Sequence, residues 1–112
     1  MDTNKRPIFL VHGLWNNPKL FEKLIRKIKE DDYELYRPHL PHKYGKTSLR
    51  RLARVLDSKI EELVGPEIEI DIVGFSMGGL ISRFWLQNYD GFLRTKRFFV
   101  LVLLILVLSQ LK

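Results

Sequence analysis

The chain has 112 residues, of which 46% are apolar and 29% charged. This composition fits one folded domain, and it excludes a disordered chain and leaves no room for a second domain. The net charge is +6, but acidic residues are mixed among the basic ones, and no aromatic-basic stripe or nucleic-acid motif is present, so we expect no nucleic-acid partner. The absence of cysteine excludes a disulfide, a thiol nucleophile and a thiolate metal site.

The amino-terminal segment is short and polar, and the apolar run at residues 8–11 is too brief for the core of a signal peptide. We therefore predict a cytoplasmic location. The longest apolar run, residues 98–108, would span only about 17 Å as a helix, against a hydrocarbon core of roughly 30 Å. We predict no transmembrane segment.

Residues 7–11 are β-branched, aromatic or apolar and end at His12-Gly13, which predicts a buried strand followed by a loop. Asn17 is suited to cap a helix, with Pro18 in its first position. An apolar stripe then recurs at three- and four-residue spacing, as in an amphipathic helix: Leu20, Phe21, Leu24, Ile25 and Ile28.

Residues 33–37 predict a weaker strand, followed by a loop to about Thr47. Thr47 or Ser48 can cap a second helix, which Gly65-Pro66 would end. The apolar stripe of this helix is Leu49, Leu52, Ala53, Leu56, Ile60 and Leu63.

Residues 67–73 predict a third strand, and residues 96–102 predict a fourth. Between them, residues 79–89 predict a helix whose packing positions are Leu80, Ile81, Phe84, Trp85 and Asn88. The repeated alternation of strand, loop and helix predicts an α/β fold, in which a parallel sheet is covered by helices on both faces as a three-layer sandwich.

The segment Gly74-Phe75-Ser76-Met77-Gly78 has the G-x-S-x-G spacing of a nucleophile elbow, between a predicted strand and a predicted helix. In such an elbow Ser76 is the nucleophile, and the backbone N–H of Met77 is one donor of the oxyanion hole. Gly74 and Gly78 are expected to be glycine because strand and helix approach each other closely there.

Two phosphate-binding interpretations are weak. Gly45-Lys46-Thr47 resembles the end of a phosphate-binding loop, but the earlier glycine of that motif falls on Leu40. A dinucleotide fingerprint also fails, because Ser76 occupies its second glycine position.

The stretches Phe9-Leu10-Val11-His12-Gly13-Leu14-Trp15 and Val73-Gly74-Phe75-Ser76-Met77-Gly78-Gly79-Leu80 together resemble the α/β-hydrolase superfamily, particularly lipases and esterases. The resemblance extends over residues 7–99. It implies a partial α/β-hydrolase fold with about four parallel strands in the order 2-1-3-4, in a single truncated domain over residues 1–112 whose tail, 100–112, is atypical.

The resemblance also implies a function. It is the hydrolysis of a small-molecule or lipid ester through an acyl-serine intermediate, without a metal or an organic cofactor. The N–H of Leu14 would be the second oxyanion donor, in a loop that begins with His12 and Gly13. The His12 side chain would hydrogen-bond backbone groups rather than transfer protons.

The chain departs from the family after Ser76. No histidine follows Ser76, and the only acid there, Asp90, should lie at the amino edge of the sheet, away from the serine. His39 and His42 follow the second strand and hence belong to the same edge as Ser76, so one of them could replace the missing base.

Two interpretations account for the missing acid and histidine. One is that the chain is the front part of a hydrolase, with the apolar tail arising from a change of reading frame. The other is a non-catalytic interaction protein that pairs with a partner, or with itself, through its sheet edge and its Leu/Val tail.

Overall fold

The computed structural model describes residues 6–13, 18–30, 33–42 and 46–101. It contains a four-stranded parallel sheet in the order β2-β1-β3-β4. The elements in chain order are β1 (Ile8–Val11), α1 (Pro18–Glu30), β2 (Leu35–Tyr36), α2 (Leu49–Val64), β3 (Ile70–Phe75), α3 (Met77–Asn88), the short 3₁₀ helix η1 (Gly91–Leu93) and β4 (Thr95–Leu101). The predicted fold class and strand order are confirmed.

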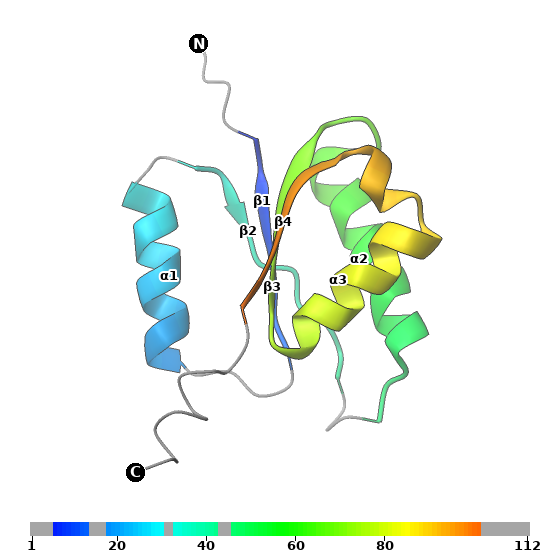
Figure 1. The fold of residues 1–112 in the computed structure, drawn as a ribbon, viewed down its shortest axis with the longest axis horizontal. Coiled ribbons are helices and arrows are strands. Elements are labelled where there is room, and N and C mark those ends of the chain that lie inside the picture. The colour runs from blue at the N-terminus through cyan, green and yellow to red at the C-terminus, as the bar shows by residue number, and fades with distance from the viewer. Residues whose placement is uncertain (1–5, 14–17, 31–32, 43–45, 102–112) are drawn as a thin grey trace.

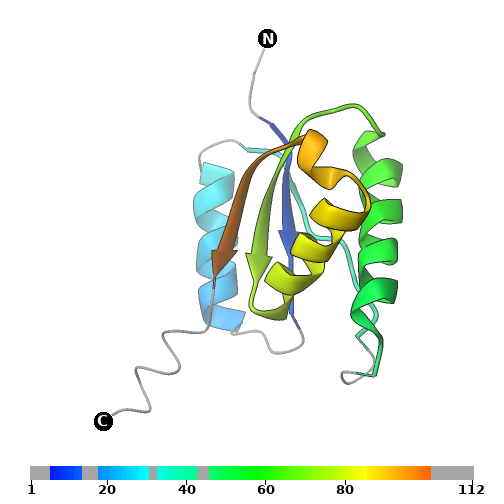
Figure 2. The same ribbon diagram turned by 45° about the vertical axis from the view of Figure 1, so that its right-hand side comes forward.

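The helices form two unequal layers (Figure 1). Helix α1 lies on one face of the sheet, and α2 and α3 lie together on the other. Figure 2 shows β1, β3 and β4 running in one direction, with α3 beginning at the edge where they end. That edge is where the segments after the strands meet.

The main core lies between the sheet and the α2–α3 layer. Alternate strand residues supply one side of it, and the helices supply the other. Its fully buried members include Phe9, Val11, Ile70 and Ile72 from the strands, and Leu52, Leu56, Ile60, Ile81 and Trp85 from the helices. A smaller core under α1 contains Leu10, Ile25 and Phe75.

Helix α2 follows its prediction closely. The Ser48 Oγ accepts a hydrogen bond of 3.1 Å from the backbone N–H of Arg51, which satisfies one of the free donors of the first turn. Gly65 ends the helix at φ 82°, a backbone conformation that favours glycine. Leu63, predicted in the apolar stripe, is exposed, and the neighbouring Val64 packs against the core instead.

The boundaries around β3 and α3 differ from the prediction. Strand β3 begins at Ile70 rather than at residue 67, and the carbonyl of Ile68 instead accepts hydrogen bonds of 3.0 and 2.7 Å from the Arg94 guanidinium. Strand β3 also extends past residue 73, its predicted end, and Gly74 pairs with both neighbouring strands. Helix α3 begins at Met77, two residues early.

Two of the five predicted packing positions of α3 are wrong. Ile81 and Trp85 are buried one turn apart, whereas Leu80 is 60% exposed and Asn88 is exposed. Only one side of α3 faces the sheet and α2, and residues 80 and 88 lie outside that side.

Strand β4 takes up the first part of the long apolar run, and residues 102–112 lie outside the described part of the chain, as does the predicted cap Asn17. Within the described residues, no helix is both long enough and apolar enough to cross a membrane.

Candidate active site

The register of the sheet brings two loops together at its carboxyl edge. Val11, the last residue of β1, pairs with Gly74 of β3, and Gly74 pairs on its other side with Val100 of β4. The segment after β1 and the segment after β3 therefore leave the sheet side by side. These segments are His12-Gly13 and the turn at Ser76.

Ser76 alone makes the turn from strand to helix. Strand β3 ends at Phe75, α3 begins at Met77, and Ser76 between them has φ 59° and ψ −122°. A non-glycine residue in this region of backbone space is strained by about 1–3 kcal/mol, and such strain is characteristic of functional sites. Ser76 is half-buried, and its side chain makes no capping hydrogen bond to α3.

The glycines beside Ser76 allow strand and helix to close on each other. A Cβ at Gly74 would lie 2.6 Å from the Cα of Gly79, and a Cβ at Gly78 would collide with the carbonyl oxygen of Val11. Real Cβ atoms essentially never come this close to backbone atoms. Any side chain at either position would push α3 away from the sheet.

Gly13 packs directly against the turn at Ser76. A Cβ added there would lie 2.8 Å from the backbone nitrogen of Met77 and 2.9 Å from the carbonyl oxygen of Phe75. As the first residue of α3, Met77 carries an N–H without a partner inside the helix, at its positive end. Leu14, the second predicted oxyanion donor, lies outside the described residues.

The His12 side chain binds backbone groups with both ring nitrogens. Its Nδ1 lies 3.1 Å from the carbonyl oxygen of Gly13, and its Nε2 lies 3.4 Å from the backbone nitrogen of Leu40. Since a carbonyl only accepts and an N–H only donates, we assign the proton to Nδ1 and the lone pair to Nε2. Neutral His12 thus ties the turn after β1 to the segment after β2.

His39 and His42 lie beside His12. The ring centroid of His12 is 6.3 Å from that of His39 and 5.1 Å from that of His42. The His42 ring is buried, with 7% of the residue exposed, and neither of its nitrogens has a hydrogen-bond partner among the described residues. Burial, followed by repulsion from His12, lowers the pKa of His42 from its ordinary value, and the backbone of His12 offsets part of this effect.

Sequence reasoning assigned His39 and His42 to this edge but missed their clustering with His12. Their separation along the chain hides the contact, which arises because β1 and β2 are neighbours in the sheet. The available signal was that all three histidines closely follow predicted strands. Parallel strands place such residues at one edge.

Asp90 lies at the other end of α3 from Ser76, in a left-handed conformation at φ 56° that precedes η1. The chain then passes through Arg94, whose carbonyl accepts a hydrogen bond of 2.9 Å from Ile70 at the start of β3. Asp90 therefore belongs to the amino edge of the sheet.

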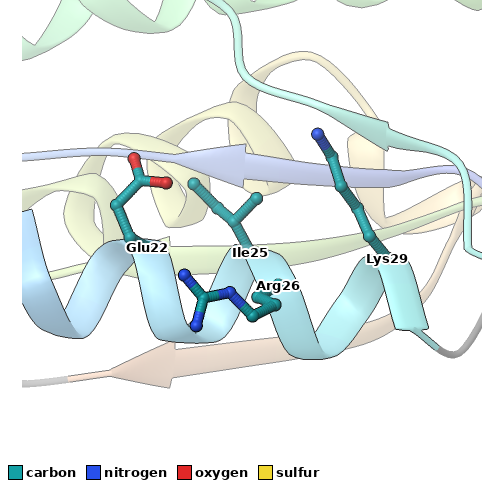
Figure 3. A pocket seen from close by; sticks show the side chains of 4 residues that line it. All are labelled: Glu22, Ile25, Arg26 and Lys29. Atoms are coloured by element: carbon teal, nitrogen blue, oxygen red, sulfur yellow. The ribbon is translucent and has the colours of Figure 1, made fainter.

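In the part of the chain that the structure describes, no group of three His, Asp or Glu side chains is arranged to hold a metal ion. A groove of about 390 Å³ runs along α1 and is lined by Glu22, Ile25, Arg26 and Lys29 (Figure 3). All four residues come from one helix, and none is a predicted site residue. This groove is separate from the turn at Ser76.

The fold and the turn at Ser76 define the class of protein. The chain belongs to the alpha/beta hydrolase fold family, which matches residues 6–102. No curated protein matches the chain.

Two solved structures have a similar fold. One is an alpha/beta hydrolase enzyme from the metagenome of lagoon sediments at Mar Chica, Morocco, with 26% identity over 87% of this chain and a TM-score of 0.69. The other, an extracellular alpha/beta-hydrolase from a Paenibacillus species described as homologous to tobacco salicylic acid binding protein 2, has 16% identity over 85% of this chain and a TM-score of 0.68. This chain spans 44% and 39% of their respective lengths.

Proposed function

We propose that the chain carries the nucleophile and oxyanion-hole portion of a serine hydrolase for carboxylic esters, with a small-molecule or lipid ester as substrate. The observation that carries this proposal is the strained, single-residue turn at Ser76, with Gly13 packed against the nitrogen of Met77. Such a turn exposes a serine hydroxyl at the carboxyl edge of a sheet, next to backbone donors.

In the proposed reaction, the Ser76 Oγ attacks the ester carbonyl carbon while its proton passes to a base. The N–H groups of Met77 and Leu14 hold the oxyanion. Collapse of the tetrahedral intermediate expels the alcohol, which takes the proton back from the base, and leaves an acyl-serine. Water then attacks the acyl carbon, which releases the carboxylic acid and restores the Ser76 hydroxyl. No metal or organic cofactor takes part.

The base is the group that the chain does not supply in the family's usual position, since no histidine follows Ser76. His12 already uses both nitrogens on backbone groups, which leaves His39 and His42 as the histidines of this chain that could accept the proton. Without a base, hydrolysis reaches only the rate that binding and the oxyanion hole provide.

The test is covalent labelling of the purified chain by a fluorophosphonate probe, with and without added imidazole as a free base. We expect slow labelling of Ser76 that imidazole accelerates several-fold, and no labelling of Ser76→Ala. Loss of labelling in His39→Gln or His42→Gln, restored by imidazole, would identify the internal base. A chain that is not labelled even with imidazole would overturn the proposal.

A second candidate function is pairing with another chain through β4, either a partner or a second copy. Among the described strands β4 is paired on one side only, and Phe99 is 53% exposed. Beside it is a cavity of about 290 Å³ lined mainly by apolar residues, including Ile8, Ile28 and Val73. An open apolar strand edge favours strand addition.

Size-exclusion chromatography over a range of concentrations tests self-association. We expect a dimer that Phe99→Lys converts to a monomer, with Leu80→Lys as an exposed control on α3. A wild-type chain that is monomeric and hydrolyses a short-chain nitrophenyl ester would eliminate this candidate.

A further inference from the structure

All three histidines of the chain gather at the carboxyl edge of the sheet, where they join the segments after β1 and β2. His12 lies in the first segment, and His39 and His42 lie in the second. The proposed chemistry at Ser76 does not require such a cluster, because one base would be enough.

The hydrogen bond between His12 and Leu40 exists only while His12 is neutral. Its Nε2 must present a lone pair to the N–H of Leu40, 3.4 Å away. Protonation turns Nε2 into a donor that faces a donor, and the bond is lost. The link between the two segments is therefore sensitive to protons.

His42 makes the same contact depend on a second proton. Its ring lies 5.1 Å from that of His12, and it is buried without a hydrogen-bond partner for either nitrogen among the described residues. A charged imidazole is costly in such a place, so protonation of His42 favours its movement toward water. When it moves, His12 loses the ring packed against it.

We propose that His12 and His42 form a pH-sensitive latch, closed when both rings are neutral and opened by protonation, which positions the Gly13 turn against the turn at Ser76. Gly13 is the residue after His12 and packs against Met77, so opening the latch frees the side of the site that Gly13 forms. His42 is a positioning residue in this arrangement. Its effect on hydrolysis rests on the proposed function, but the latch itself does not.

The titratable groups that act on the charge of His42 are His12, from the segment after β1, and His39, from its own segment. A positive charge on either ring repels a positive charge on His42. Each proton therefore raises the cost of the next while the latch stays closed, and opening releases all of the repulsion at once. We expect the latch to open over a narrow range of pH.

Hydrogen exchange of the Leu40 amide tests the latch without any substrate. Exchange is followed from pH 8 to pH 5, corrected for its intrinsic pH dependence, with the Ile72 amide of β3 as the reference for global unfolding. The logarithm of the Leu40 protection factor is plotted against pH. Its slope is about two if opening is coupled to two protons, and about one if opening is coupled to one proton.

In the wild type we expect the steeper slope, with at least a tenfold loss of Leu40 protection while Ile72 stays protected. We expect the shallower slope in His42→Phe, or in His42→Gln if the former fails to fold, and none in the double variant with His12→Gln. Leu80→Ala, at an exposed position of α3, is the control and should retain the wild-type slope.

Protection of Leu40 that does not change with pH would overturn the latch, and a His42→Phe slope equal to that of the wild type would remove His42 from it. Fluorophosphonate labelling across the same pH range separates the two proposals. If protection of the Leu40 amide depends on pH in a chain that is never labelled, the latch stands and the hydrolase proposal is rejected. If the chain is labelled but protection of Leu40 does not depend on pH, the hydrolase proposal stands and the latch is rejected.

Discussion

The carbonyl oxygen of Val11 lies against the Cα of Gly78, so closely that no Cβ fits between them. This contact joins the end of β1 to the first turn of α3. Together with the pairing of Val11 and Gly74, it fixes where the turn at Ser76 stands relative to the turn at Gly13. The geometry of the candidate site thus depends on Gly74 and Gly78, two positions without side chains.

Gly78→Ala should be strongly destabilising, since the new methyl group would collide with backbone atoms that cannot move without breaking the pairing of β1. We expect a loss of about 3 kcal/mol in the free energy of unfolding, at the upper end of the usual cost of overpacking. Urea unfolding measures it. Leu80→Ala, on the exposed side of the same helix, should change stability by less than about 0.5 kcal/mol. Equal effects at both positions would contradict the close approach.

Ser76→Gly should be more stable than Ser76→Ala. Both remove the hydroxyl, but glycine adopts the positive φ of this position without strain, whereas alanine keeps the strain. We expect a difference of about 1 kcal/mol in favour of glycine by urea unfolding. Neither variant should react with a fluorophosphonate. A more stable alanine variant would show that the turn at Ser76 is not strained.

Asp57 supports the packing of α2 on α3. Its Oδ1 accepts a hydrogen bond of 2.8 Å from the Nε1 of Trp85, whose side chain is almost completely buried. Asp57→Ala leaves this donor without a partner and should cost about 1–3 kcal/mol. Asp57→Asn keeps an acceptor and should cost less. If thermal unfolding ranks the two variants equally, the hydrogen bond does not contribute as inferred.

The stability of the whole domain should fall at acid pH because of His42. Burial lowers the pKa of His42 below its ordinary value of 6.5, so the unfolded chain takes up a proton at a higher pH than the folded one. The free energy of unfolding should therefore decrease as the pH falls below about 6.5 and level off below the lowered pKa. Urea unfolding at pH 7.5, 6.5 and 5.5 measures this decrease.

His42→Phe removes the titrating group while keeping an aromatic ring in the buried space. Its stability should depend less on pH over this range than that of the wild type, whereas exposed Leu80→Ala should leave the dependence unchanged. A steeper dependence in His42→Phe would mean that His42 stabilises the folded chain in its charged form.

Local patterns predicted most of the fold. The alternation of apolar runs and amphipathic segments gave four strands and three helices, and the cap at Ser48 and the stop at Gly65 followed from backbone chemistry confined to a few residues. The start of β3 was wrong because residues 67–69 look like strand. A distant guanidinium, that of Arg94, holds the carbonyl of Ile68 instead.

The sequence by itself determined the turn at Ser76, because two glycines around a serine between a strand and a helix are a local steric requirement. It also determined that no histidine follows Ser76. Only the tertiary structure decided that Gly13 packs on Met77 and that His12, His39 and His42 lie together. Those contacts depend on which strands are neighbours and in which register, and pairing between strands far apart in the chain leaves no mark in any single segment.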